Sequence, residues 1–285
     1  MIPFNIIMDP TIILVTFFFF FFIVLPVGFG ILIYVIFKRG KENKQKRIAS
    51  CENFAKANNM TYQKEVDDSF VEGFRKFTLM NQHSYMRTLT KGVELIKNPI
   101  KITNYMRKVD ESGEWEIFDC VIFEKNYTES SQSRVNTNDR LRTYMIFSIK
   151  TNMDLNDVII KKSLKYHLNR GEDIAKMQYL LKGYNFREFF KNLQELNEPK
   201  IPKFKDIDID KITKYEIFGS NINDEELINL ISYMRENSGR LELEVKENHV
   251  LIYEEFKSGY LKPYEEYMNE TLPVVKEILN KVAKL

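Results

Sequence analysis

The sequence predicts an α+β protein, with a single N-terminal transmembrane helix followed by a cytosolic mixed domain of antiparallel β-hairpins and packed helices. Residues 11–37 carry no charged side chain, and roughly 20 apolar residues in a helix cross a bilayer core of about 30 Å. Later segments alternate apolar and polar residues, as strands do, or repeat apolar residues at helical spacing. The predicted parts are a short extracytoplasmic N-terminus (1–10), the transmembrane helix (11–37), a basic juxtamembrane helix (38–59), a β-rich α+β region (60–198) and a C-terminal β-α-β-β-α module (199–285).

The apolar run has the features of an uncleaved anchor rather than of a secretory signal peptide. A signal peptide has a shorter apolar region, preceded by positive charge and followed by a small-residue cleavage site. Here the first ten residues carry only the charge of Asp9, and the run ends directly at Lys38 and Arg39. Six consecutive phenylalanines, Phe17 to Phe22, supply lipid-facing area and need no aromatic binding site to explain them.

A cluster of positive charge follows the apolar run. Its members are Lys38, Arg39, Lys41, Lys44, Lys46 and Arg47. With the single acid Glu42 they leave a charge of +5 over residues 38–47, against −1 on the other flank. Because Lys and Arg accumulate on the cytoplasmic side of a membrane protein, we expect a single-pass protein of the cell membrane with its N-terminus outside and its C-terminal domain in the cytoplasm.

Residues 41–58 are predicted to continue as a helix. Ile48, Cys51 and Phe54 fall on one face at three-residue spacing. One interpretation is a stalk with this face packed on the domain. A second is a basic helix attracted to anionic lipid head groups, each cation near the surface contributing about 1 kcal/mol. Both can hold, and the six cations from Lys38 to Arg47 are the predicted membrane-surface residues.

Composition limits what the remaining chain is expected to bind. The whole chain carries +2, so residues 48–285 carry −2, and we expect no nucleic acid partner. Roughly 240 residues suffice for one large domain or two small ones. The two cysteines, Cys51 and Cys120, form no disulfide framework, as is usual in a reducing cytosol. The glycosylation sequon at Asn126 matters only if the domain faces outward.

Short strands are predicted from Met60 onward, at 60–62, 93–96 and 100–105. The strongest pair is 115–125 with 141–150, because both are rich in aromatic and β-branched residues. Fifteen mostly polar residues, 126–140, connect these two strands and are too many for a tight turn. We expect a solvated hairpin loop there, with a binding loop as the alternative.

Two helices are predicted next, at 174–184 and 186–196, from apolar residues at helical spacing. The phenylalanines of the second helix are expected in the core. Pro199 and Pro202 then mark a linker.

The C-terminal module begins with extended chain over 207–218. Asn223, with Glu226 three residues later, then predicts a helix start, and the helix is expected to end near 237–239. Alternating residues over 241–253 predict a hairpin with one solvent-exposed face, turning at 246–249. A final helix over 261–285 is expected to break or kink near Pro273.

The segment Asp210-Lys-Ile-Thr-Lys-Tyr-Glu-Ile-Phe-Gly, the acidic helix start after it and the following hairpin resemble the C-terminal part of a family of prokaryotic membrane-anchored proteins of unknown function. The hairpin of 115–150 is similar to the upstream portion of that family. The likeness covers the chain from about Asn58 onward and rests on patterns of core residues. This chain lacks the Pro and the aromatic residue that often precede the Phe/Tyr strand of the family. The resemblance implies no activity and no catalytic residue.

No motif for a specific reaction stands out. His83, His167 and His249 lie far apart without metal-ligand spacing, and no nucleophile elbow, phosphate loop or dinucleotide turn occurs. Asp206, Asp208 and Asp210 alternate on one strand but lack the Gly and Glu of a calcium loop. Cys120 is expected to be buried. We therefore predict no catalytic, cofactor-binding or metal-ligating residue.

Two functions remain open at this stage. The first is a non-enzymatic module that interacts with a protein partner or a lipid surface. The alternative is a membrane-bound, hydrolase-like enzyme whose site is dispersed in sequence, so that a fold would have to bring His and carboxylate side chains together in a pocket.

Overall fold

The computed structural model describes residues 18–88, 92–111, 113–124, 127–129, 135–137, 140–164, 195, 197, 199–208, 213–238, 240–256 and 263–285. The chain forms two compact units, Met1–Ser50 and Cys51–Leu285. The predicted helix over 174–184 lies outside the described residues, and of the helix over 186–196 only Glu195 is described, as helical. The predicted linker at Pro199 and Pro202 leads directly into strand, because Lys203 and Lys205 belong to a strand over Lys203–Asp208.

The N-terminal unit is helical where it is described. A π-helical turn, η1 (Phe20–Val24), leads into α2 (Leu25–Ala57), and the N–H of Leu25 donates to the carbonyl of Phe20. Pro26 follows directly. Proline has no N–H, and its ring clashes with the carbonyl four residues earlier in a regular α-helix, so a wider turn at this point accommodates it.

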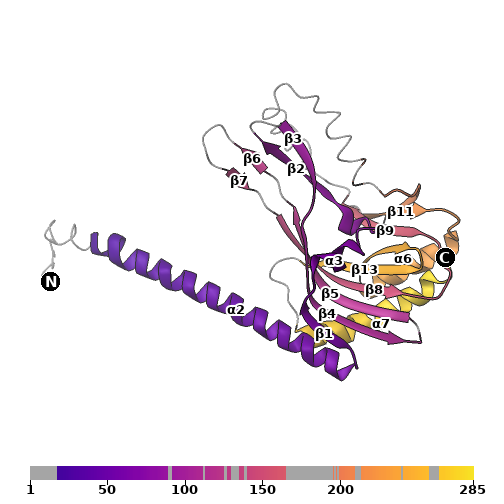
Figure 1. Ribbon diagram of the computed structural model, residues 1–285, viewed down its shortest axis with the longest axis horizontal. Helices are drawn as coiled ribbons and strands as arrows, with labels where there is room; N and C mark the ends of the chain where they lie inside the picture. The colour runs from indigo at the N-terminus through magenta and orange to yellow at the C-terminus, as the bar shows by residue number, and fades with distance from the viewer. Residues whose placement is uncertain are drawn as a thin grey trace, which may run out of the picture. The chain divides into compact units, whose positions relative to one another are not determined.

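The second unit is built on one antiparallel sheet of nine strands (Figure 1). In spatial order these are β1 (Thr61–Glu65), β4 (Ile100–Asp110), β5 (Gly113–Glu124), β8 (Arg140–Lys150), β13 (His249–Phe256), β12 (Glu242–Lys246), β9 (Val158–Leu164), β11 (Thr213–Gly219) and β10 (Lys203–Asp208). The predicted pairing of 115–125 with 141–150 is confirmed, since β5 and β8 pair from Glu114 with Lys150 to Glu124 with Arg140. The α+β class is likewise confirmed.

A smaller sheet has the order β3 (Gly92–Lys97), β2 (His83–Thr88), β6 (Tyr127–Glu129) and β7 (Val135–Thr137). Strands β6 and β7 fall inside the segment 126–140, for which a solvated loop was the expectation. They pair with each other, and Tyr127 pairs with Met86 of β2. The described parts of this connection therefore extend a second sheet.

The C-terminal strands enter the middle of the large sheet rather than forming a sheet of their own. Strand β13 pairs with β8, and β12 pairs with β9. The predicted boundary at residue 199 thus does not coincide with any break in strand pairing. The expected single extended segment over 207–218 is instead a hairpin, in which β10 pairs antiparallel with β11.

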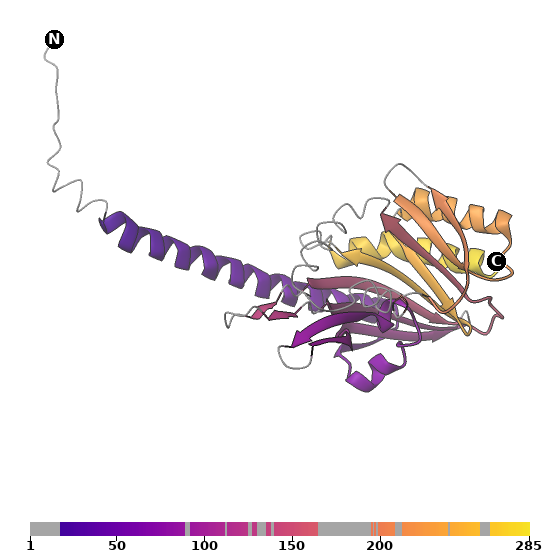
Figure 2. The same cartoon turned by 90° about the horizontal axis from the view of Figure 1, so that it is seen from above.

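Different elements cover the two faces of this sheet (Figure 2). On one face pack α6 (Asp224–Ser238), α7 (Tyr264–Val282) and the last turns of α2, through a core that includes Leu230, Ile278 and Phe54. On the other face lies the segment 67–82, which contains α3 (Asp68–Glu72) and the 3₁₀ turn η2 (Leu79–Asn81). We call this segment the strap.

The prediction that one face of the hairpin over 241–253 is exposed to solvent was wrong. Glu244 is 3% exposed and His249 is 3% exposed, so the face that the alternation assigned to water is buried. The reason is tertiary: β12 and β13 have neighbouring strands on both sides, and the strap covers the polar face. The turn itself is as predicted, with Glu247 and Asn248 at φ 52° and 59°, as a two-residue type I′ turn requires.

The predicted helix boundaries in this module hold closely. The side-chain oxygen of Asn223 accepts from the backbone N–H groups of Glu225 (3.0 Å) and Glu226 (3.3 Å), which caps α6. The sequence predicted a break or a kink near Pro273; helix α7 runs through Pro273 without a break.

Gly113 provides a test of the sheet geometry. Its φ is 134°, and a Cβ there would overlap the carbonyl oxygen of Lys150. We expect Gly113→Ala to lower the free energy of unfolding by about 2–4 kcal/mol through backbone strain and overlap. Urea unfolding of the full-length protein in detergent, followed by the fluorescence of the single, buried tryptophan Trp115, measures this.

Gly73→Ala is the matched control. Gly73 has ordinary helical φ and ψ, and a Cβ there would lie 3.4 Å from the nearest atom. This variant should change the free energy of unfolding by less than about 1 kcal/mol. Equal effects of the two substitutions would contradict the register of β5 with β8.

Candidate functional site

Among the described residues, one helix is long and apolar enough to cross a membrane. It spans Phe20–Ala57, its most apolar window has a mean hydropathy of 2.7, and none of that window is buried. The exposed fraction reaches 69% at Phe22 and 76% at Phe37. Apolar side chains exposed in such number are costly in water. The length, composition and exposure of this helix fit a membrane anchor.

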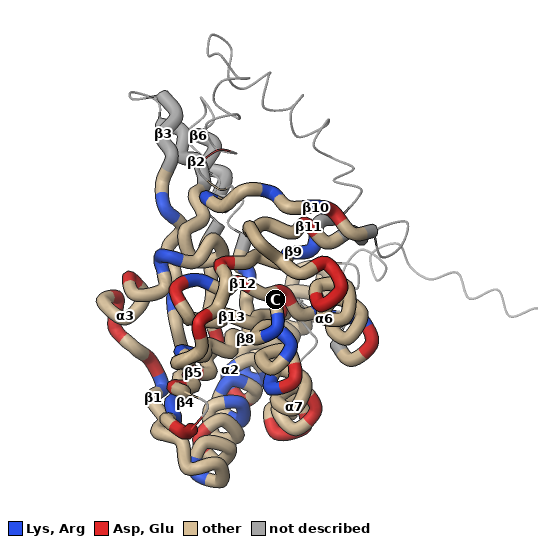
Figure 3. Tube along the Cα trace, turned by 90° about the vertical axis from the view of Figure 1, so that its right-hand side faces the viewer, with Lys and Arg blue, Asp and Glu red and all other residues tan. Residues whose placement is uncertain are grey.

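The predicted membrane-surface residues lie on α2 directly after the apolar part. Lys38, Arg39, Lys41, Lys44 and Lys46 are exposed, and Arg47 is half-buried. None of the first five forms an ion pair within the described part of the chain, whereas Arg47 has a contact of its own. The Cα trace of α2 carries several successive stretches of Lys and Arg in Figure 3.

These cations surround the helix instead of lining one side. An α-helix turns about 100° per residue, so the six positions leave no gap wider than about 80° around the axis. A helix that lies flat on a membrane concentrates its cations on one face. We call the six residues the basic collar, since their distribution suits a helix that passes through the head-group layer.

A buried polar network joins the central strands of the domain. Ser148 on β8 donates to Glu116 on β5 (Oγ to Oε2, 3.0 Å), and Tyr105 on β4 donates to the other carboxylate oxygen (2.8 Å). His249 Nε2 lies 2.7 Å from the Ser148 oxygen. Because the Ser148 proton is used by Glu116, the short contact requires the N–H at Nε2 of His249. The sequence analysis did not find this network, because the strands that carry its residues are far apart in the chain.

The network is enclosed rather than open to a substrate. His249 is 3% exposed and Ser148 0% exposed, and the rings of Phe74 and Phe77 lie 5.7 and 5.0 Å from the imidazole ring. Burial, followed by the positive charges of Lys76 and Lys150, lowers the pKa of His249 to about 3. The imidazole is therefore neutral and holds Ser148 in place; its Nδ1 has no hydrogen-bond partner among the described residues.

A second buried carboxylate attaches the strap to the sheet. Glu244 on β12 accepts from the backbone N–H groups of Thr78 (2.6 Å) and Leu79 (2.9 Å) and from the hydroxyl of Tyr253 (3.2 Å). Burial raises the pKa of Glu244, and these three donors partly offset that effect. Without the carboxylate, two backbone N–H groups beneath the strap would lose their acceptor, at a cost of about 1–3 kcal/mol each.

The other titratable candidates are dispersed. His83 begins β2, where its backbone is bonded to the side chain of Asn197. Cys120 is buried beside the sulfur of Met80 (3.6 Å), and burial raises the pKa of its thiol. Asp206 pairs with Lys203, whereas Asp210 and His167 lie outside the described residues. Within the described ranges no three His, Cys, Asp or Glu side chains form a group suited to a metal ion.

Comparison of the chain with models of protein families, with characterised proteins and with solved structures gave no match. The resemblance to a family of prokaryotic membrane-anchored proteins therefore gains no support from these comparisons. The function has to be argued from the geometry of the anchor, the collar and the domain.

The neutral state of buried His249 has a measurable consequence. The folded pKa of about 3 lies below the ordinary value of 6.5, so only the unfolded chain takes up a proton between these values. The stability that neutral His249 provides is complete above pH 6.5 and is lost as the pH falls toward 3. His249→Gln keeps an N–H donor for Ser148 but cannot titrate.

We expect the difference in free energy of unfolding between wild type and His249→Gln to fall by about 1.4 kcal/mol per pH unit from about pH 6 to pH 4. Urea unfolding monitored by Trp115 fluorescence at several pH values gives this difference. Burial raises the pKa of Glu242 to about 7, so this carboxyl group makes a contribution to stability with the opposite pH dependence. That contribution cancels in the difference, because both variants contain Glu242. Parallel pH profiles would show that His249 is protonated or exposed in the folded protein.

Proposed function

We propose that the chain is a single-pass protein of the cell membrane whose domain is held at the cytoplasmic face and acts as a non-enzymatic interaction module at the lipid surface. The observation that carries this proposal is the combination of a helix with no buried residue in its most apolar window and a basic collar directly after that window. Five of the six collar residues are exposed. The positive charge of the collar supports a cytoplasmic location for this end of the helix.

The charges of the collar favour anionic lipid as the contact. Lys38, Lys41 and Lys44 have no ion pair with any described residue, so their charge is available to head groups. A cation near an anionic leaflet contributes about 1 kcal/mol, and six of them would make the interface strongly dependent on salt. A protein partner of the domain is compatible with this arrangement, and nothing on the described surface selects one.

A membrane-bound hydrolase is the second candidate, and one contact favours it. The Ser148 oxygen and the Nε2 of His249 lie 2.7 Å apart, the distance of a nucleophile and its base. Three features weigh against it: both side chains are buried, the carboxylate of Glu116 bonds to the serine instead of orienting the histidine, and the pKa of His249 is about 3. An enzyme of this kind would have to lift the strap before each turnover.

Protease accessibility tests the orientation. We expect that protease added to spheroplasts of a bacterial host leaves the domain of the wild-type protein intact and digests it only after lysis. Replacing all six collar residues by Gln should yield a mixed population with a digested fraction, because the charge bias that orients the helix is removed. A domain digested from outside in the wild type, or sugar attached at Asn126 in a eukaryotic host, would refute the proposed placement.

Energy transfer to labelled lipid tests the contact with anionic head groups. A donor fluorophore on Asn43→Cys, an exposed position within the collar, reports on acceptor-labelled phosphatidylserine, since both native cysteines are buried. We expect transfer to exceed that to labelled phosphatidylcholine, and to fall to the phosphatidylcholine level in high salt or in the six-Gln variant. Equal energy transfer to the two labelled lipids in the wild type would contradict the proposed interaction with anionic head groups.

A further inference from the structure

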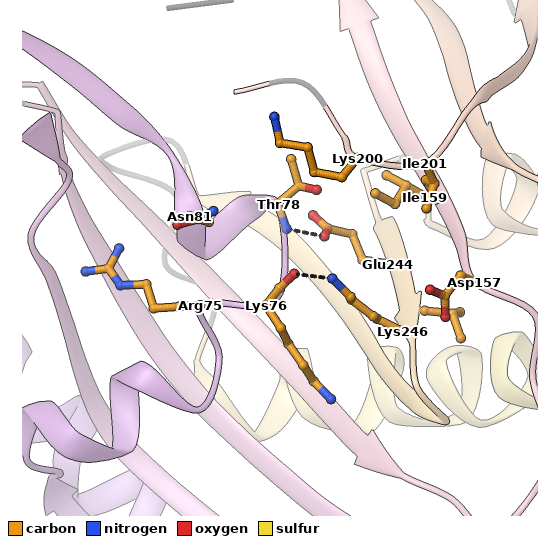
Figure 4. A pocket seen from close by; sticks show the side chains of 11 residues that line it. Arg75, Lys76, Thr78, Asn81, Asp157, Ile159, Lys200, Ile201, Glu244 and Lys246 are labelled. Atoms are coloured by element: carbon orange, nitrogen blue, oxygen red, sulfur yellow. Dashed lines mark hydrogen bonds between the residues drawn. The ribbon is translucent and has the colours of Figure 1, made fainter. Parts of the chain in front are cut away.

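The cavity of about 160 Å³ between the strap and β12 has walls of mixed charge (Figure 4). The carboxylate of Glu244 lies between the ammonium groups of Lys200 and Lys246, and it accepts from the backbone N–H of Thr78. Positive and negative groups therefore alternate around this space, which suits neither an anion nor a cation.

A second group of polar side chains converges at one end of the large sheet. Strands β9 and β13 end there, and β11 and β12 begin there. Lys162 on β9 lies directly opposite Tyr215 on β11, on the face that the helices cover, and its Nζ is 5.7 Å from the centre of the Tyr215 ring. Glu242 is the first residue of β12, and its carboxyl group accepts a hydrogen bond from the backbone of Lys162. The topology thus brings an amine, a phenol and a carboxyl group together.

A second carboxylate, Glu254 on β13, acts on the same amine. Glu254 is 5% exposed; it accepts from the hydroxyl of Tyr267 (3.1 Å) and pairs with Arg240 (3.6 Å). These two partners fix its position, and its charge favours the protonated form of Lys162. A cation formed at Lys162 therefore has two carboxylates beside it.

The hydroxyl of Tyr215 points to a missing ligand. Tyr215 is 0% exposed, and its hydroxyl has no hydrogen-bond partner among the described residues. A buried hydroxyl without a partner is costly and is rare in folded proteins. Burial, followed by the charge of Glu242, raises the pKa of this hydroxyl to about 12, so it keeps its proton and can donate. A bound acceptor such as a carbonyl oxygen would satisfy it.

The protonation states at this site suit a reaction of the amine. Burial lowers the pKa of half-buried Lys162 from 10.5 to about 8, although Glu242 and Glu254 oppose the shift. At pH 7.5 about one quarter of Lys162 is then neutral, against about 0.1% of an ordinary lysine. Burial also raises the pKa of Glu242 to about 7, so this group is partly protonated at the same pH. A neutral amine beside a carboxylic acid is what imine formation requires.

We propose that Lys162 binds a neutral aldehyde or ketone covalently as an imine, with Tyr215 donating to the carbonyl oxygen and Glu242 supplying a proton. The Nζ of Lys162 attacks the carbonyl carbon, and a proton moves from this nitrogen to the oxygen. The carboxyl group of Glu242 then protonates the hydroxyl, which leaves as water as the C=N bond forms. The iminium cation that remains lies beside Glu242 and Glu254. The same two carboxylates disfavour an anionic carbonyl compound.

Reductive trapping tests this in the full-length protein in nanodiscs of phosphatidylcholine. Propionaldehyde with sodium cyanoborohydride converts each imine into a stable propyl-lysine, and peptide mass spectrometry gives the rate at each lysine. We expect Lys162 to react at least about tenfold faster than Lys161 at pH 7.5, because the neutral amine is the attacking species. Lys161 is the internal control, since it lies on the opposite face of the same strand and pairs with Glu216 (3.7 Å).

Two substitutions separate the roles of the neighbouring groups. Tyr215→Phe removes only the unpartnered hydroxyl, so the urea midpoint of the Trp115 transition should stay that of wild type, while the rate at Lys162 falls at least about threefold. Glu242→Gln should lower that rate at least about tenfold, because a general acid contributes about 10²–10⁴-fold and the neutral fraction of Lys162 can rise at most about fourfold. Lys161→Arg is the matched control and should leave the rate at Lys162 unchanged.

The imine site is refuted if Lys162 reacts no faster than Lys161 in the wild type. It is equally refuted if either Tyr215→Phe or Glu242→Gln leaves the rate at Lys162 unchanged, as expected of a lysine that serves only as an ion-pair partner. Because the adduct forms on the domain and phosphatidylcholine carries no net charge, these results do not depend on the contact between the collar and anionic lipid.

Discussion

Burial of the β12–β13 hairpin on both faces is the constraint on which the rest of the domain depends. A central strand pair has its backbone groups satisfied by its neighbours, but side chains on its polar face must find partners inside the protein. Glu244 meets this requirement by accepting from the backbone of the strap, and His249 by bonding to Ser148. The strap is thus held by polar contacts from the same strands that it covers.

The apolar part of the strap explains why these polar contacts are enclosed. Phe74 packs edge-to-face on Phe118 (5.1 Å between ring centroids) and also lies against His249. Burying a side chain of this size contributes about 1.5–3 kcal/mol, enough to offset the desolvation of one neutral polar group. Hydrogen bonds and aromatic packing therefore support each other, and the Ser148–His249 pair is better understood as part of the core than as a reaction centre.

The constraint on the N-terminal unit is of a different kind. The helix has no buried side chain in its most apolar window and is long and apolar enough to cross a membrane, where all its backbone groups would have to be satisfied within the helix. The π-helical turn before Pro26 preserves helical hydrogen bonding around a residue that has no donor. The basic collar then begins where the apolar residues end. The anchor thus depends on composition alone, whereas the domain depends on contacts between distant segments.

Much of the local structure could be predicted from the sequence. The α2 segment over 41–58, the β5–β8 pair, the Asn223 cap and the turn at Glu247 and Asn248 all follow from neighbouring residues and short-range periodicity. The pairing of β13 with β8 could not be predicted, because alternation specifies the faces of a strand but not its neighbours.

What the sequence by itself determined is the presence of an apolar segment long enough to cross a membrane, the charge that follows it and the local elements, since each depends on residues close together in the chain. Only the tertiary structure decided that Glu244 and His249 are buried and that Lys200 and Lys246 line one cavity with Thr78. Burial is a property of what packs on a strand from elsewhere. A residue pattern that reads as solvent-facing in an isolated hairpin becomes core when nine strands and a strap enclose it.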